Sequence, residues 1–297
     1  MFVQENSLKE VKSYFSSKLA NKFSRTEIKL IVKLIVIKRL SINSLSYFNA
    51  VDIRFSESDL LYFRNVANRL LDNEPFQYVL GEVEFYNLEL NIDERALIPR
   101  PETEELVDWL IESVKKNDTP RILDLCAGSG CIALALKSTI KDAEIVAVEL
   151  SQSALDLIED NCEKTELVVD FQKMDVLDKE GYSLFEEASF DIWVSNPPYI
   201  PEVDKAMMHE NVLDYEPHMA LFVDDEDPLL FYRIIAEQAQ TYLKPGGWLY
   251  FEIHEGLAEK MHGMLHDLQF VNIELRKDLQ EKDRMMRAQL VISQHES

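Results

Sequence analysis

The sequence predicts an α/β fold in which helices cover both faces of a mostly parallel β-sheet. Short apolar segments alternate with amphipathic segments through residues 101–297, an order typical of strands joined by helices. Residues 1–73 instead carry apolar side chains every three or four positions, which predicts a small helical domain. Residues 74–100 link the two parts, and an alternating apolar and polar stretch around Asn87 predicts a β-hairpin there.

The helical domain is predicted from two runs of apolar residues at helical spacing, at residues 8–19 and 60–70. Serine and asparagine residues between 41 and 49 are expected to interrupt the helices. The most apolar stretch, 28–40, contains three lysines and is too short to span a bilayer. We expect a buried helix there, and a basic amphipathic helix on a membrane surface is the alternative.

Seven strands are expected in the α/β part of the chain. Their ranges are 121–125, 144–150, 168–174, 190–195, 248–253, 270–276 and 288–293. Ser151 is expected to cap a helix over 152–164, and Asp227 with Pro228 to begin another over 228–243. The last two strands are close together in the chain, so a hairpin is expected there.

Composition and charge limit the class of protein. The chain has 297 residues, 46% of them hydrophobic, which is enough for two globular domains. The net charge is −23, but residues 1–73 hold 12 basic and 7 acidic residues, whereas the remainder holds 19 and 47. An acidic body repels a phosphate backbone, so free nucleic acid is a poor substrate and a basic protein partner suits it better.

Cysteine usage and the N-terminus indicate a cytoplasmic protein. Cys126, Cys131 and Cys162 are odd in number and form no CxxC pair, so we expect reduced thiols and no metal site. Residues 1–15 carry acidic residues and lack an uninterrupted apolar core, so they do not resemble a signal peptide.

Three segments after successive strands suggest an adenosyl cofactor. The first is a loop of small residues between a strand and a helix, Cys126-Ala127-Gly128-Ser129-Gly130. Its glycines let a ligand approach the backbone at the carboxyl edge of the sheet. Glu149 ends the second strand and can accept hydrogen bonds from both hydroxyls of a ribose. Asp175 ends the third strand and can accept from the exocyclic amino group of adenine.

The segment Asn196-Pro197-Pro198-Tyr199, after the fourth strand, decides the class of chemistry. Asn196 supplies a side-chain carbonyl, the prolines fix the backbone and remove N–H donors, and Tyr199 supplies a flat face. This set suits a planar amide, because it offers acceptors for both amide hydrogens and a ring to stack on. Holding both hydrogens can raise the electron density on the amide nitrogen, which is otherwise a poor nucleophile. We therefore expect methyl transfer from a sulfonium cofactor to an amide nitrogen.

Over nearly the whole chain, these segments resemble the release factor glutamine methyltransferase family. The resemblance is carried by Glu74-Pro75-Phe76-Gln77-Tyr78-Val79-Leu80-Gly81, Leu97-Ile98-Pro99-Arg100-Pro101-Glu102-Thr103-Glu104 and Asn196-Pro197-Pro198-Tyr199. It implies a Rossmann-like class I methyltransferase domain with a seven-stranded sheet and S-adenosylmethionine as cofactor. It also implies that the substrate is the glutamine of a Gly-Gly-Gln loop in class I peptide chain release factors, and that the helical domain recognises that protein.

The resemblance also assigns roles to individual residues. The residues implied to bind the cofactor are Cys126, Ala127, Gly128, Ser129, Gly130, Glu149, Asp175, Val176 and Asn196. The substrate glutamine is implied to lie on Asn196, Pro197, Pro198 and Tyr199, with Asn196, Pro197 and Tyr199 as the catalytic residues. Two positions depart from the family pattern, since many relatives have glycine in place of Cys126 and aspartate in place of Glu149.

Two other classes of function stay open at this point. An amino methyltransferase that acts on a nucleic-acid base uses the same Asn-Pro-Pro-Tyr chemistry. The acidic charge beyond residue 73 disfavours it, while the basic N-terminal segment keeps it open. The other class is an inactive, methyltransferase-like binding module, which the intact Asn196, Tyr199 and Glu149 disfavour.

Overall fold

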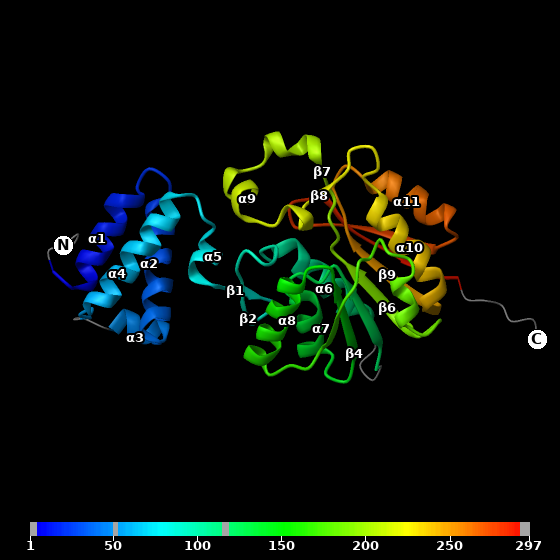
Figure 1. Cartoon of the computed structure of the whole chain (residues 1–297), viewed down its shortest axis with the longest axis horizontal. Coiled ribbons are helices and arrows are strands. Elements are labelled where there is room, and N and C mark those ends of the chain that lie inside the picture. Colours follow the sequence, from blue (N-terminus) through cyan, green and yellow to red (C-terminus); the bar gives the residue numbers. More distant parts are fainter. Residues whose placement is uncertain (1–4, 50–52, 115–118, 292–297) are drawn as a thin grey trace, which may run out of the picture. The chain divides into compact units, whose positions relative to one another are not determined.

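The computed structural model describes residues 5–49, 53–114 and 119–291. It consists of two compact units (Figure 1). The helical unit comprises Met1–Gly81 and His209–Tyr215, and the α/β unit comprises Glu82–Met208 and Glu216–Ser297. The short segment His209–Tyr215 thus belongs with helices that precede it by more than a hundred residues, which the sequence analysis did not anticipate.

The helical unit is held together by a core between its longer helices. Its helices are α1 Leu8–Leu19, α2 Arg25–Leu40, α3 Ser44–Asn49, α4 Glu57–Leu71, α5 Phe76–Leu80 and α9 Glu210–Tyr215. The apolar faces of α1, α2 and α4 meet around Phe15, Ile35 and Phe63, whose exposed fractions are 0%. The helices predicted at residues 8–19, 60–70 and 28–40 are therefore confirmed. The helix at 28–40 buries only one face, however, and Leu30 on its other face is 52% exposed.

Polar side chains begin these helices. Ser24 and Ser56 form capping boxes with the acidic residues at the third positions of α2 and α4. Asn43 in the same way accepts a hydrogen bond of 2.8 Å from the backbone N–H of Ser46. The serine and asparagine cluster at 41–49 was expected to interrupt the helices, and this is wrong in part because the cluster starts α3.

A β-hairpin opens the α/β unit, and a hairpin was predicted there. Strands β1 Glu82–Phe85 and β2 Leu88–Asn91 pair antiparallel across Tyr86 and Asn87. These two turn residues have φ angles of 49° and 62°, the left-handed conformation that a two-residue hairpin turn requires. The backbone N–H of Tyr86 donates to Glu104 at 2.6 Å, which ties the turn to the helix that follows.

The α/β unit contains a seven-stranded sheet with the order β10-β11-β9-β6-β3-β4-β5. Its strands are β3 Arg121–Leu125, β4 Glu144–Glu149, β5 Asp170–Lys173, β6 Phe190–Ser195, β9 Leu243–Glu252, β10 Val271–Lys277 and β11 Asp283–Gln289. Strands β3, β4, β5, β6 and β9 run parallel, whereas β11 is antiparallel to both of its neighbours. This confirms the mostly parallel sheet and the C-terminal hairpin.

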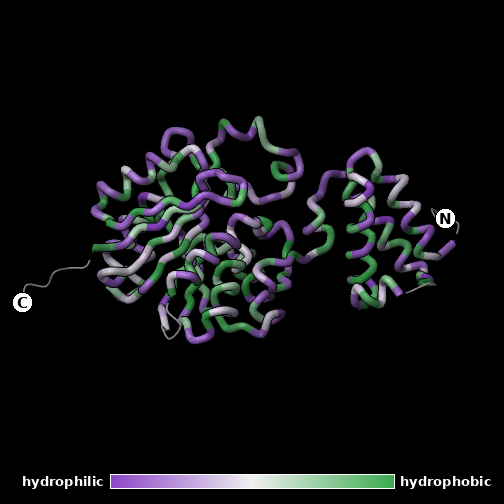
Figure 2. Tube along the Cα trace, turned by 180° about the vertical axis from the view of Figure 1, so that it is seen from behind, coloured by the Kyte–Doolittle hydropathy of each residue, from purple (hydrophilic) through white to green (hydrophobic). Residues whose placement is uncertain are grey.

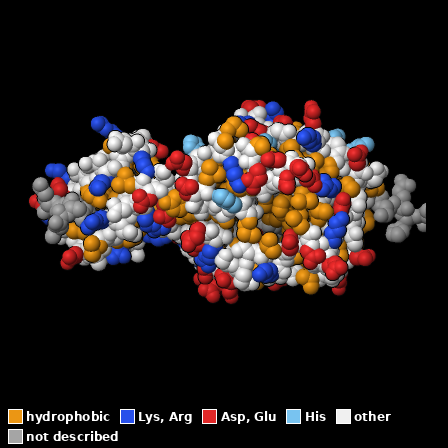
Figure 3. Space-filling view, turned by 45° about the horizontal axis from the view of Figure 1, so that its top comes forward, with side chains coloured by type: hydrophobic (Ala, Val, Ile, Leu, Met, Phe, Trp, Pro, Cys, Tyr) orange, Lys and Arg blue, Asp and Glu red, His pale blue; other side chains and the backbone are white. Residues whose placement is uncertain are grey.

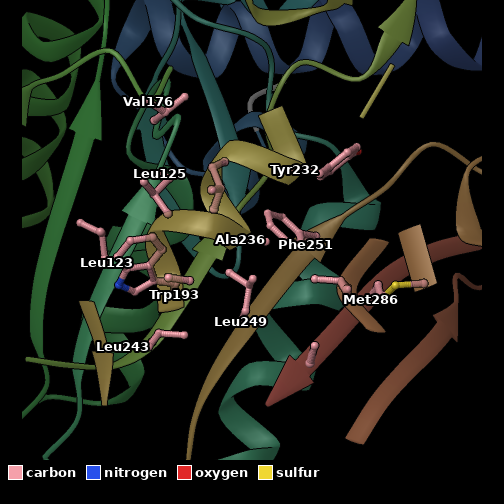
Figure 4. Packing of buried hydrophobic residues seen from close by; sticks show 14 of the residues in the cluster. Leu123, Leu125, Val176, Trp193, Tyr232, Ala236, Leu243, Leu249, Phe251 and Met286 are labelled. Atoms are coloured by element: carbon pink, nitrogen blue, oxygen red, sulfur yellow. The ribbon is translucent and has the colours of Figure 1, made fainter. Parts of the chain in front are cut away.

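Helices cover both faces of the sheet. The longer helices are α6 Pro101–Ser113, α7 Cys131–Thr139, α8 Gln152–Thr165, α10 Leu230–Tyr242 and α11 Ala258–Asp267. Neighbouring strand residues point to opposite faces, so Ile122 and Ile192 join the core under α6, α7 and α8. Leu123 and Trp193 join the other core, where they lie with Ala236 of α10 (Figure 4).

Shorter elements connect these layers. They are the two-stranded sheet of β7 Ile200–Pro201 and β8 Phe222–Val223, and the 3-10 helices η1 Gly181–Leu184, η2 Glu202–Met207 and η3 His218–Ala220. The predicted cap at Ser151 is confirmed, because its side chain accepts from the backbone N–H of Ala154. Pro101 occupies the first turn of α6, where a missing N–H is tolerated.

Three predicted boundaries in the α/β unit differ clearly from the structure. The strand expected at 248–253 begins five residues earlier, since β9 runs from Leu243 to Glu252. The last strand was expected at 288–293, but it begins at Asp283, and residues 292 and 293 lie outside the described residues. Its early part was missed because Arg284 and Arg287 make it look polar, although both side chains pair with carboxylates. Asp227 does not cap the next helix, since α10 begins at Leu230 and the Asp227 carboxylate instead accepts from Arg233.

Hydropathy and charge are distributed as the fold requires. Figure 2 shows hydrophobic residues along the strands and hydrophilic residues along many of the loops. Figure 3 shows lysine and arginine side chains over the helical unit and groups of aspartate and glutamate on the α/β unit. Within the described ranges, no helix is both long and apolar enough to cross a membrane. The same ranges contain no cluster of His, Cys, Asp and Glu that could hold a metal ion.

Candidate active site

The predicted site residues gather at one edge of the sheet. Strands β5, β4, β3 and β6 are adjacent and parallel, so their carboxyl ends share an edge, where ligands of this kind of sheet bind. A cavity of about 350 Å³ lies there. The predicted residues that line it are Cys126, Ala127, Gly128, Ser129, Glu149, Asp175, Val176, Asn196 and Pro198. Gly130, Pro197 and Tyr199 are not in its walls.

The loop after β3 brings backbone, rather than side chains, to the cavity. Cys126, Gly128 and Gly130 have φ angles of 62°, 57° and 77°. A Cβ added to Gly128 would meet no atom within 4 Å, so the backbone there borders open space. A Cβ on Gly130 would lie 3.2 Å from the side chain of Ile158, which explains a glycine at the start of α7. Cys126 adopts a conformation that costs a non-glycine residue roughly 1–2 kcal/mol.

Two acidic side chains at the cavity are oriented by backbone N–H groups. The Glu149 carboxylate accepts from Gly128 at one oxygen and from Ser151 at the other, both at 2.9 Å. Each oxygen keeps a lone pair that a ligand hydroxyl can use. Asp175 is held by the backbone N–H of Leu177, also at 2.9 Å. The same loops that place these carboxylates therefore also fix their direction.

Burial raises the pKa values of two side chains near the loop after β3, those of Asp124 and Cys126. Asp124 is fully buried, and its Oδ2 accepts from the backbone N–H of Ala133 at 3.1 Å. Its Oδ1 has no hydrogen-bond partner among the described residues. Burial raises the pKa of Asp124 to about 8, so this carboxyl holds a proton near neutral pH. Burial, helped by the charge of Glu149, raises the pKa of the Cys126 thiol, so Cys126 is not a thiolate nucleophile.

Asn196, which lines the opposite side of the cavity, and Tyr199, which does not line it, are held by side chains from distant parts of the chain. Asn196 Nδ2 donates to Thr103 Oγ1 at 3.3 Å. The Thr103 hydroxyl donates to Glu252 Oε2 at 2.6 Å, and the Tyr199 hydroxyl donates to Glu252 Oε1 at 2.9 Å. Burial raises the pKa of the Glu252 carboxyl, and burial together with Glu252 raises the pKa of Tyr199.

A second buried carboxylate braces the wall near α6. Glu216, whose exposed fraction is 4%, accepts from Arg100 Nη2 at 2.6 Å and from the backbone N–H of Ile98 at 3.2 Å. Because a buried carboxylate needs such partners, this pair fixes the loop before α6 against the segment that follows α9.

Several residues of the site were missed by the sequence analysis. Those that line the cavity without having been predicted to do so include Leu97, Pro99, Arg100, Thr103, Met174, Leu177, Met219, Ala220, Phe222 and Phe231. Glu252 was missed as well, although it follows an apolar strand as Glu149 does, so the same rule could have found it. No pattern in the sequence marks Phe231.

Comparisons with known proteins agree with this arrangement. A family model described as the methyltransferase small domain matches residues 105–215. The chain is 39% identical to the release factor glutamine methyltransferase of Bacteroides thetaiotaomicron, over 95% of this chain and 99% of that protein. It is 38% identical to the release factor glutamine methyltransferase of Flavobacterium psychrophilum, over 94% and 98%. A solved methyltransferase structure from Pyrococcus furiosus, 17% identical, matches the fold over 77% of this chain and 99% of that one, with a TM-score of 0.51.

The sheet order, the glycine-containing loop at its carboxyl edge and the acid that ends the neighbouring strand define a class I, Rossmann-like S-adenosylmethionine-dependent methyltransferase. The predicted fold class is therefore confirmed. Within that class, the chain belongs to the release factor glutamine methyltransferase family.

Proposed function

We propose that this protein transfers a methyl group from S-adenosylmethionine to the side-chain amide nitrogen, N5, of the glutamine in the Gly-Gly-Gln loop of class I peptide chain release factors. The observation that carries the proposal is Asn196. It lines the cavity, and within the described residues its Oδ1 has no protein partner while its Nδ2 is bound by Thr103. Its carbonyl can therefore accept a hydrogen from a second amide. The names of the curated relatives support the same substrate.

The cavity fits the cofactor in its donor set and its open backbone. In this proposal the loop from Cys126 to Gly130 lies along the cofactor, and the free lone pairs of Glu149 accept the ribose hydroxyls. Asp175 and Val176 face the adenine. When it is bound, S-adenosylmethionine supplies an electrophilic methyl group.

The acceptor amide is oriented by the segment that follows β6. Asn196 Oδ1 and the backbone carbonyl of Pro197 accept the two hydrogens of the glutamine amide, and the ring of Tyr199 with Pro198 confines its plane. Two accepted hydrogen bonds leave electron density on the nitrogen and fix the direction of its attack. As the N–CH3 bond would form, the S–CH3 bond of the sulfonium would break and leave a neutral thioether. One amide hydrogen would be lost as a proton to water, because the acceptor carbonyls orient that hydrogen but are too weakly basic to keep it.

We also propose that residues 1–73 recognise the protein substrate, that 74–100 link the domains and that 101–297 carry the chemistry. The support is the charge distribution: the acidic remainder suits a basic tip of the protein partner, and the basic N-terminal part would hold a second surface of that partner. Steering by charge acts on the association rate and fades with salt. Raising the ionic strength from about 0.05 to 0.5 M should therefore slow association with a release factor in stopped-flow measurements. A salt-independent rate would contradict this role of the charges.

The cytoplasmic location of the protein also stays a prediction.

The function is tested with methyl-labelled S-adenosylmethionine and a purified class I release factor. Peptide mapping should find the label on the glutamine of the Gly-Gly-Gln loop. A release factor with alanine at that position is the matched control and should remain unlabelled. Label on nucleic acid alone would favour the base methyltransferase, and cofactor binding without transfer to either would favour the binding module.

A further inference from the structure

Glu252 is a buried carboxylate that the proposed chemistry has not yet used. It stands at the carboxyl end of β9 with an exposed fraction of 1%. Its two oxygens accept from two hydroxyl groups, those of Thr103 at 2.6 Å and Tyr199 at 2.9 Å. A carboxylate is buried at a cost unless such bonds compensate, so its place beside the cavity requires a reason.

The Thr103 hydroxyl gives the hydrogen bonds a direction. A hydroxyl has one hydrogen, and Thr103 donates it to Glu252 Oε2. Thr103 Oγ1 can then only accept from Asn196, at 3.3 Å, so the Asn196 atom that faces it must be Nδ2. The opposite orientation would place two acceptors against each other. Asn196 Oδ1 is thereby directed away from Thr103 and stays available to the cavity.

The same carboxylate also fixes Tyr199. The Tyr199 hydroxyl is committed to Glu252, so the part of this side chain that remains for a ligand is its ring. The edge-on contact with His254, with ring centroids 6.3 Å apart, constrains the ring from a second direction. One carboxylate therefore sets the orientation of both polar side chains of the Asn-Pro-Pro-Tyr segment.

We propose that Thr103 and Glu252 are positioning residues that fix the Asn196 amide with its oxygen toward the acceptor nitrogen and hold the Tyr199 ring in place. This inference rests on the proposed function for its substrate. The Asn196 amide donates to the Thr103 hydroxyl, which in turn donates to the Glu252 carboxyl group. Hydrogen bonds in such a chain strengthen one another, so the Asn196 amide is polarised. Asn196 Oδ1 becomes a stronger acceptor for the hydrogens of the substrate amide.

The decisive variant is Thr103→Val, because it keeps the shape of the side chain and removes the hydroxyl. In the full-length enzyme we expect kcat with release factor to fall by about tenfold or more, the loss expected for a hydrogen bond to a charged group. KM and the calorimetric Kd for S-adenosylmethionine should stay within about twofold. Thr103→Ser, which restores the hydroxyl, should recover most of kcat.

Thr165→Val is the matched control, since it removes a hydroxyl bonded to the Asn161 carbonyl at 2.7 Å in α8, outside the cavity. It should leave kcat unchanged. Wild-type kcat in Thr103→Val would overturn the proposal. Equal losses in the valine and serine variants, or a loss matched by weaker cofactor binding, would also overturn it because they indicate general structural damage.

A second measurement does not depend on the protein substrate. With 15N-asparagine labelling, the side-chain amide resonances of Asn196 should shift in Thr103→Val and in Glu252→Gln but return in Thr103→Ser. Unchanged resonances in Thr103→Val would overturn the positioning role even if the release factor proved not to be the substrate. A wild-type enzyme that fails to methylate release factor, with these shifts present, would instead contradict only the proposed function.

Discussion

The two sides of the cavity are built in different ways. On the cofactor side, the anchors are close in the chain: Asp175 is held by the backbone N–H of Leu177, two residues on, and Glu149 by those of Ser151, two residues on, and Gly128, 21 residues back on the neighbouring strand's loop. On the acceptor side, Asn196 and Tyr199 depend on Thr103 and Glu252, which come from α6 and from the end of β9. The cofactor-side anchors need at most the pairing of β3 with β4, whereas the acceptor-side anchors need α6, β6 and β9 to be in place. Because the acceptor side would orient the reacting amide and the cofactor side would hold the cofactor, changes on the acceptor side should act on catalysis and changes on the cofactor side on binding.

The largest effect is expected for Asn196→Ala on the acceptor side. The variant removes an acceptor for the substrate amide, so kcat should fall by the order of 10²-fold or more, about 2.7 kcal/mol. The Kd for S-adenosylmethionine should change little. Steady-state kinetics and calorimetry check the two values. Asn272→Ala, at an exposed position of β10, is the control and should retain full activity. A folded Asn196→Ala enzyme with near wild-type kcat would contradict the amide interaction.

A smaller effect, on binding, is expected for Glu149→Ala. The loss of two hydroxyl contacts should weaken S-adenosylmethionine binding at least about tenfold, close to 1.4 kcal/mol. At saturating cofactor, kcat should stay near the wild-type value. Glu149→Asp keeps the carboxylate and serves as the matched variant, with a smaller loss. Calorimetric affinity that is unchanged in the alanine variant would rule out the ribose contact.

The protonation state of Asp124, which is buried beneath the cofactor loop, can be tested through the pH dependence of stability. Its folded pKa of about 8 lies above the ordinary value of 3.8, because burial disfavours the charged form. Below pH 3.8, the carboxyl is protonated in both the folded and the unfolded chain. Between pH 3.8 and about 8, it stays protonated in the folded chain but has lost its proton in the unfolded chain. Stability from this group is therefore lost as pH rises, and the loss ends near pH 8.

Asp124→Asn keeps the shape and does not titrate. The free energy of unfolding of the variant, relative to that of the wild type, should therefore increase by at most about 1.4 kcal/mol per pH unit between about pH 5 and 8. Denaturant unfolding across this pH range measures the difference. A constant difference would show that Asp124 is ionised in the folded protein throughout.

The sequence predicted the local elements of the fold well. Helices α1, α2 and α4 and the turn at Asn87 follow from spacing, caps and turn residues that lie within a few positions of each other. The start of β11 was not predicted, because its arginines are neutralised by Asp278 and Glu274, and these pairs exist only in the folded sheet. Apolar patterning cannot mark a strand whose charges are paired across it.

The same distinction applies to the site. The loop at Gly128, Glu149 and Asp175 could be predicted because each follows a strand at a spacing that parallel sheets share. Phe231 reaches the cavity from a helix that has no such relation to the strand ends. Thr103 lay within a recognised motif, but its partner Glu252 is 149 residues away, so the bond between them could not be inferred from spacing.

The composition of the helical unit has a consequence for the order of folding. Tyr215 donates to the carbonyl of Asp72 at 2.7 Å, and Asn73 donates to Glu210 at 3.2 Å, across separations of 143 and 137 residues. The ribosome therefore completes α1 to α5 well before it makes α9. At roughly 5–20 residues per second, the delay is on the order of ten seconds. The helical unit is thus first synthesised without α9. It can be completed only after the segment from Asn196 to Tyr199, which precedes α9 in the chain, has left the ribosome.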